Sequence, residues 1–160
     1  MNIKTSVRGL KEVKELMASL PRGIKLQAME AIATYLIGNE QRGLAKAPER
    51  VQHDAGNPYQ WQSEKQRRAF FATDGFGGGI PYKRTGNLSA GWVYSSTDSN
   101  WTSVKIENIE SYAGFVMGDQ QQRGHAADKW RKFADVISTN LTGAIRSAQR
   151  RVDEWIKQHA

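Results

Sequence analysis

The feature that most constrains the fold of this chain is a long apolar stripe near its C-terminus. Between residues 130 and 155, apolar side chains recur at intervals of three and four residues. The stripe consists of Trp130, Phe133, Ile137, Leu141, Ala144, Ala148, Val152 and Trp155. This spacing places them on one face of an α-helix, and that face must be buried against the rest of the protein. We therefore predict a long amphipathic helix that begins near Asp128, which is expected to cap it.

The N-terminal part of the chain predicts one short strand followed by two helices. Apolar and polar residues alternate over 2–7, as in a strand, and residues 9–20 have apolar positions at helical spacing. A second helix is expected over 21–44, closed by Gly43 and Pro48. Its apolar stripe consists of Ile24, Ala28, Ile32, Tyr35 and Leu36.

Strand signals follow in the second half of the chain. Residues 91–96 and 101–108 are rich in β-branched and aromatic side chains, and the polar stretch 97–100 between them predicts a hairpin. Alternation along the second strand places Trp101 and Val104 on opposite faces. A third strand is expected over 111–117. Together these elements predict an α+β fold, in which a small, mostly antiparallel sheet has long N- and C-terminal helices packed on one face.

A long central excursion interrupts this plan. Residues 48–86 hold three of the four prolines and much of the glycine, yet one short helix is expected over 63–72, capped by Ser63. The length of 160 residues fits one domain. We predict a single domain over 1–160 with an extended loop or arm at about 50–84. Connections of this length are usually functional or flexible.

Cysteine content, hydropathy and net charge limit the classes of protein to which this chain can belong. There is no cysteine, which excludes disulfides and thiolate metal sites and favours an intracellular assembly compartment. Neither a secretory signal nor a membrane span is expected, so the protein is predicted to be soluble. The 23 basic and 16 acidic residues give a net charge of +7. That charge fits an acidic partner such as nucleic acid, or a solvated surface with a basic excess.

No catalytic, cofactor or metal constellation emerges from the motifs. The run of glycines before Lys83 fails the P-loop pattern because Pro81, which has no N–H, stands where phosphate donors are needed. His53, His125 and His159 lie far apart without metal-ligand spacing. Ser89 is not in a nucleophile elbow, and Glu107 and Glu110 are expected to form a solvated pair at a strand end. We predict no enzyme activity, no cofactor and no metal.

Nucleic-acid binding remains open at this point. Basic and aromatic side chains alternate in two stretches, 65–71 and 82–84, where cations could contact phosphates and aromatic rings could stack on bases. The cations are Lys65, Arg67, Arg68, Lys83 and Arg84. The alternative is that the aromatic rings are core or subunit contacts and the cations are solvated. No sequence-reading motif is present, so any contact is expected to be with backbone charge.

Three motifs follow one another along the chain. An alanine-rich helix ends in Ala47-Pro48, a Thr-Gly-x-Leu step follows at 85–88, and Tyr112-Ala113 precedes Gly118. This order of features resembles the tail-completion or neck proteins of long-tailed bacteriophages, the putative tail-component family. The resemblance covers most of the chain in order. The chain departs from the family at "MGDQ", where an acidic-Gly-Thr step is usual, and its segment 49–84 is longer than in the simplest members. These departures affect the docking details more than the class.

The resemblance implies a structural virion protein of the head–tail junction, assembled in the bacterial host cytoplasm. Such a protein forms a homo-oligomeric ring of about six or twelve subunits that joins a connector or adaptor to tail-tube or terminator proteins around the DNA channel. A tail terminator at the same junction and a free, charge-driven nucleic-acid-binding protein are the alternatives. Candidate subunit or connector contacts are Trp61, Phe70, Phe71 and Phe76, because aromatic residues dominate interface hot spots. Candidate DNA-channel or polar contacts are Lys65, Arg67, Arg68, Lys83 and Arg84.

Overall fold

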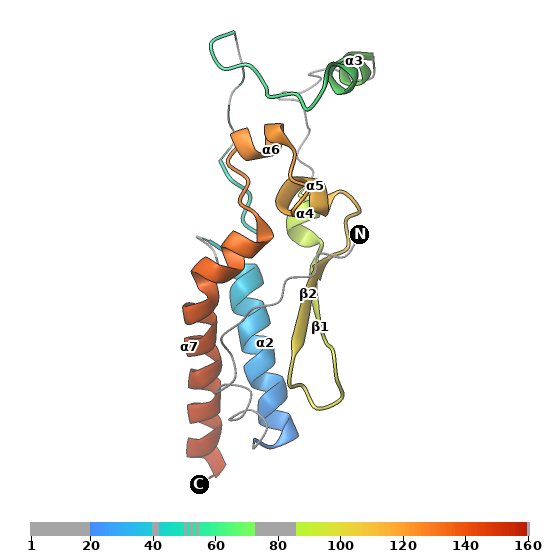
Figure 1. Cartoon of the computed structure of the whole chain (residues 1–160). Helices are drawn as coiled ribbons and strands as arrows, with labels where there is room; N and C mark the ends of the chain where they lie inside the picture. The colour runs from blue at the N-terminus through green and yellow to red at the C-terminus, as the bar shows by residue number, and fades with distance from the viewer. Residues whose placement is uncertain are drawn as a thin grey trace.

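The computed structural model describes residues 20–39, 42–49, 51, 53, 55–72 and 86–159, apart from the side chain of Phe70. Two long helices, α2 (Arg22–Gly38) and α7 (Phe133–His159), lie side by side. The hairpin of β1 (Trp92–Ser96) and β2 (Val104–Asn108) lies along α2 (Figure 1). The α+β prediction is therefore confirmed. The expected strand over 2–7 and nearly all of the expected helix over 9–20 lie outside the described residues.

The two long helices pack through small and branched apolar side chains. Helix α2 buries Ile24, Ala28, Met29, Ala33 and Leu36, and α7 buries Phe133, Val136, Ile137, Asn140, Ala144 and Ala148. A β-carbon added to Gly143 of α7 would lie 2.2 Å from the Tyr35 Oη of α2. The glycine in the middle of α7 therefore lets the Tyr35 ring lie against the helix backbone.

Helix α2 ends earlier than the sequence predicts, at Gly38 instead of Leu44. The side-chain Oδ1 of Asn39 accepts a hydrogen bond from the Arg42 backbone N–H at 3.2 Å. Such a local asparagine turn competes with helix continuation. The chain then folds back, and the buried Leu44 donates its backbone N–H to the Leu36 carbonyl at 2.9 Å.

The hairpin is present where it was predicted, but its second strand begins three residues later. The antiparallel register pairs Trp92 with Asn108 and Ser96 with Val104. Trp101 has a positive φ of 55° and belongs to the turn, so strand alternation does not apply to it. Trp101 and Val104 consequently pack against the same buried cluster of α2 and α7, and their expected placement on opposite faces was wrong.

The turn of the hairpin is organised around one carboxylate. Asp98 accepts hydrogen bonds from the Thr102 backbone and hydroxyl, the Ser103 hydroxyl and the Asn100 N–H. These bonds, those from Thr102 above all, hold the pKa of the Asp98 carboxyl at about 2, below its usual value of 3.8.

The predicted third strand over 111–117 was wrong, because this segment forms the short helix α5 (Ala113–Met117). Its buried side chains are Ala113, Val116 and Met117, and spacings of three and one place them on one helical face. Helix α6 (Arg123–Ala127) follows. Asp128 ends α6 instead of starting α7, so the predicted cap at Asp128 was also wrong.

Gly86, the first described residue after the excursion, turns the chain into a short helix that precedes the hairpin. Gly86 has a positive φ of 85°, which glycine adopts at little cost, and α4 (Asn87–Ala90) follows it. Leu88 and Trp92 are both buried, and the Trp92 ring stacks on Phe133 with centroids 5.6 Å apart. This segment therefore anchors the chain to the core at the start of the hairpin.

Candidate functional site: an arm fastened to the body

Residues 55–72, which we call the arm, extend beyond α6 at the end of the molecule opposite the C-terminus (Figure 1). The arm ends in helix α3 (Glu64–Ala72). Most of its described side chains are exposed, and Tyr59 is its one buried residue among them. The arm thus has a buried point of attachment and an exposed helix.

A His–Asp pair fastens the base of the arm. The His53 Nε2 lies 2.6 Å from the Asp128 Oδ1, and the two side chains are only 5% and 6% exposed. The other ring nitrogen, Nδ1, lies 3.0 Å from the Asn57 carbonyl oxygen. Each ring nitrogen therefore faces an oxygen. Both contacts are hydrogen bonds at once only if the ring carries two protons or the carboxyl carries one.

Tyr59 packs against a gap that only glycine provides. A β-carbon added to Gly124 of α6 would lie 1.9 Å from the Tyr59 Oη, so any side chain at residue 124 would displace the ring. Tyr59 also makes edge contacts with His53 and Trp61, at centroid distances of 5.2 and 4.8 Å. The pair, the tyrosine and the glycine form one packed unit, which we call the arm anchor.

Glutamine side chains join α3 to α6. The Gln66 Nε2 donates to the Gln122 Oε1 at 2.9 Å, and the Gln66 Oε1 accepts the Gln62 backbone N–H at 2.8 Å. Gln62 in turn accepts the backbone N–H of Arg123 through its Oε1 at 3.4 Å. These bonds orient α3 on the body without burying it.

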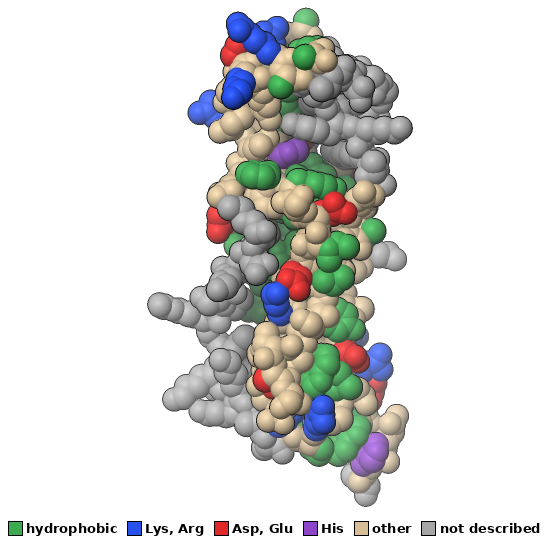
Figure 2. Space-filling model, turned by 90° about the vertical axis from the view of Figure 1, so that its right-hand side faces the viewer, with side chains coloured by type: hydrophobic (Ala, Val, Ile, Leu, Met, Phe, Trp, Pro, Cys, Tyr) green, Lys and Arg blue, Asp and Glu red, His purple; other side chains and the backbone are tan. Residues whose placement is uncertain are grey.

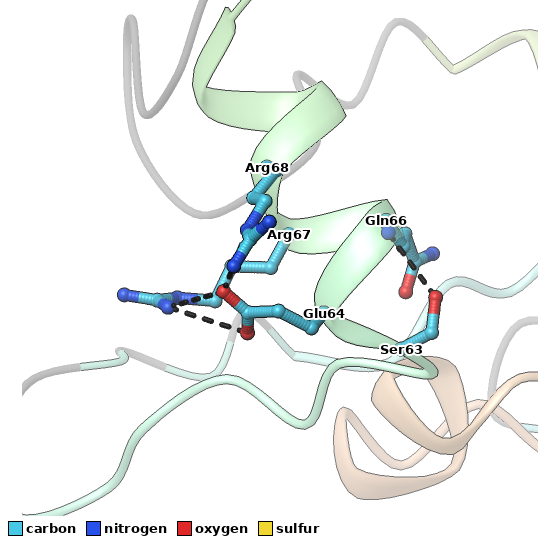
Figure 3. A network of polar contacts seen from close by, with 5 residues as sticks. All are labelled: Ser63, Glu64, Gln66, Arg67 and Arg68. Carbon is cyan, nitrogen blue, oxygen red and sulfur yellow. Dashed lines mark hydrogen bonds and ion pairs between the residues drawn. The ribbon is translucent and has the colours of Figure 1, made fainter.

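Helix α3 begins as predicted, with Ser63 as its cap. The Ser63 Oγ accepts the Gln66 backbone N–H at 3.1 Å (Figure 3). Glu64 pairs with both Arg67 and Arg68, at 3.0 and 3.3 Å. The arginine side chains are 52% and 81% exposed, and ion pairs in such positions contribute little free energy. Their guanidinium groups therefore remain available to an external partner.

Six of the nine predicted contact residues lie in the arm, and the side chains of five of them are described. Lys65, Arg67 and Arg68 lie on α3, and Phe71, 48% exposed, has the Arg67 guanidinium 5.9 Å from its ring centroid. Trp61 is half-buried, 5.9 Å from Phe71 between ring centroids, so it also packs within the arm. The Phe70 side chain and Phe76, Lys83 and Arg84 lie outside the described residues.

Sequence reasoning missed the arm anchor. His53 and Asp128 are 75 residues apart, and nothing in the local pattern around either links them. Tyr59 and Gly124 likewise belong to segments interpreted as turns and polar connections. Their only signal was residue type, since His53, Pro58 and Tyr59 stand close together at the start of the excursion.

Within the described part of the chain, no group of three or more His, Asp or Glu side chains is arranged to hold a metal ion. None of the helices seen in that part has the length and apolar character needed to cross a bilayer. Comparisons with protein-family models, with curated proteins and with solved structures find no match for this chain.

Proposed function

We propose that this chain is a structural protein of the bacteriophage head–tail junction, a neck or tail-completion protein that forms a ring around the DNA channel. The observation that carries the proposal is the arm: its base is buried at His53 and Tyr59, while its helix α3 is exposed on the far side. An element held firmly at its base and solvated at its tip suits contact with a neighbouring subunit.

The sequence of features supports the same function. The Thr-Gly step at 85–88 and the Tyr-Ala step at 112–113 give the resemblance to the tail-completion family, and the structure describes Gly86 of the first and both residues of the second. Gly86 turns the chain into the hairpin, and Ala113 is buried at the start of α5. These steps act as architectural elements, so the mechanism we propose is assembly without a catalysed reaction.

The charge of the chain supports a role beside DNA. The net charge is +7, and the exposed cations Lys65, Arg67 and Arg68 lie together on α3. Cations that contact phosphates give sequence-independent, salt-sensitive attraction. In a ring, such side chains tolerate or attract the DNA that passes through. The partners are then other copies of the chain, a connector or adaptor, and tail-tube or terminator proteins of the virion.

Electron microscopy of the purified protein tests this function. A neck protein is expected to form closed rings with a central opening, and to bind isolated connectors. Rings that bind only tail tubes would identify the chain as a tail terminator instead. Single subunits that coat duplex DNA without forming rings would contradict the proposal and favour the free nucleic-acid-binding protein.

A further inference from the structure

The hairpin and α5 expose a group of large apolar side chains, which we call the hairpin face. It consists of Val93, Ile109, Tyr112 and Phe115. Each exposes more than a third of its surface, and Ile109 exposes 69%. Figure 2 shows hydrophobic side chains following one another along one side of the body, with acidic and basic side chains among them. Apolar groups that gather in this way commonly mark a surface that binds another protein.

Backbone pairing places two of these side chains, Val93 and Ile109, on one side of the hairpin. The Ile109 N–H donates to the Gly91 carbonyl at 2.9 Å, which extends the strand register by one pair. Ile109 and Val93 therefore point to the same side of the hairpin. Gly91, which pairs with Ile109, has no side chain to cover it. Tyr112 and Phe115 are three residues apart at α5, away from its buried face.

The segment that carries the hairpin face has an acidic excess, although the chain as a whole is basic. Between residues 86 and 122 there are four acidic side chains and one basic side chain, Lys105. The acidic ones are Asp98, Glu107, Glu110 and Asp119. Glu107 forms an ion pair with Lys105, and Asp98 is hydrogen-bonded within the hairpin turn. Glu110 follows Ile109 in the chain, and its Cγ would lie 3.2 Å from a β-carbon added to Gly91, which pairs with Ile109, so this acidic side chain lies beside the face.

Helix α3 has the complementary character. Phe71 exposes 48% of its surface, and the described charges of α3 are three cations and the single acid Glu64. The β1–β2 hairpin of the same chain runs along α2, whereas α3 lies beyond α6 at the end of the molecule (Figure 1). Helix α3, which has an exposed Phe71 and an excess of cations, therefore extends away from the hairpin segment, which has exposed apolar side chains and an excess of acids.

We propose that the hairpin face is the docking surface for the arm of a second copy of this chain. Phe71 of one copy enters the apolar group that includes Phe115, and the basic side chains of α3 face Glu110. Opposite charges at the edge of an apolar contact set its orientation and speed its formation. The contact is head to tail, and such contacts close into rings when the rotation between copies permits. The inference rests on the proposed function and names the two surfaces that the ring would join.

Complementation between two variants of the full chain tests the contact. Phe71→Ser removes the centre of the arm, and Phe115→Ser removes the centre of the hairpin face. Both residues are exposed, so the variants are expected to unfold at nearly the wild-type temperature. Each variant alone is expected to be monomeric at concentrations where wild type is multimeric. An equimolar mixture retains one intact arm and one intact face, so it should form dimers and nothing larger by sedimentation.

A matched control and the contrary outcomes complete the test. Ile156→Ser changes an apolar side chain of similar exposure, 47%, that lies on α7, and it should multimerise as wild type does. Multimers that persist in both variants would overturn the docking surface but leave a ring-forming function standing. The same holds if the mixture stays monomeric. A wild-type chain that is monomeric throughout would contradict the docking surface and the ring together.

Cysteine cross-linking identifies which copy supplies the arm, because the chain has no cysteine of its own. Under mild oxidation, a mixture of the Phe71→Cys and Phe115→Cys variants should give disulfide-linked dimers of unlike chains. A chain with both substitutions should give linked multimers. If the doubly substituted chain instead forms an internal disulfide as a monomer, the arm docks on its own hairpin and the proposal fails.

Discussion

Removal of the carboxylate at the base of the arm should release the arm while the body stays folded. Asp128→Ala leaves the His53 Nε2 without its partner, 2.6 Å away in wild type, in a place where the ring is only 5% exposed. Breaking a buried pair by removing one member costs about 3–5 kcal/mol. Because 1.4 kcal/mol corresponds to a factor of ten, attachment of the arm should weaken by about two to three orders of magnitude or more.

Limited chymotrypsin digestion measures that release. Cleavage after Tyr59 requires the buried ring to leave Gly124, so its initial rate follows the open fraction when closing is faster than cleavage. We expect cleavage after Tyr59 to accelerate by about a hundredfold or more in Asp128→Ala. The rate after the exposed Phe71 serves as an internal control and should change little. A rate after Tyr59 within threefold of wild type would refute the reasoning.

A double-mutant cycle separates the pair from other effects of the substitution. The variant that combines His53→Ala with Asp128→Ala leaves neither partner buried and unpaired, so its cost should fall well below the sum of the two single costs. Asp128→Asn keeps an oxygen in place and loses the charge, so an intermediate cost of about 1–2 kcal/mol is expected. Additive single costs would mean that the two side chains do not interact.

Three further perturbations follow from the fold. Gly143→Ala should lower the free energy of unfolding by about 1 kcal/mol despite the better helix propensity of alanine, because the new methyl overlaps the Tyr35 ring; a gain of stability in urea unfolding would show that the ring moves aside freely. Because hydrogen bonds lower the pKa of Asp98 from 3.8 to about 2, its ionised carboxylate stabilises the folded state above pH 3.8. This contribution is lost as the pH falls toward about 2. Thermal unfolding of Asp98→Asn should therefore lose less stability than wild type between pH 5 and pH 2, and equal losses would contradict this. Replacing Lys65 and Arg68 by alanine should weaken residual binding to duplex DNA and reduce its salt slope by about one for each phosphate that is no longer neutralised; an unchanged slope would exclude these two cations from binding DNA.

Local periodicity explains which parts of the fold could be predicted from the sequence. The helical stripe through Phe133, Ile137 and Ala144, and the strand composition of the hairpin, both act over a few residues, so they appear directly in the sequence. The cap at Ser63 is equally local. These elements were predicted because residue type and spacing alone determine them.

Short segments were harder to predict because two periodicities compete in them. Ala113, Val116 and Met117 have helical spacing, but the neighbouring Tyr112 and Phe115 are typical of strands, and five residues are too few to decide. Burial against the core favours the helix there. Strand alternation was likewise extended too far toward the N-terminus of the second strand. Nothing in the composition indicated that the turn predicted over 97–100 would continue through Trp101.

The candidate site could be predicted only in part. The exposed end of the arm is contiguous in sequence, so the cations and aromatic side chains of α3 could be identified. The anchor joins His53 and Tyr59 to Gly124 and Asp128, across a separation that no local pattern spans. The hairpin face arises from strand register and a helix that was predicted as a strand. The arm anchor and the hairpin face therefore depend on tertiary contacts, which local sequence patterns do not encode.

The solution mass of the wild-type protein, measured by light scattering over a wide range of concentration, tests the ring most directly. A junction protein that assembles through its arms should reach a discrete mass, corresponding to about six or twelve subunits, and should stay there as concentration rises. A chain that remains monomeric at every concentration, and binds duplex DNA tightly with a steep dependence on salt, would contradict the ring and indicate a free nucleic-acid-binding protein.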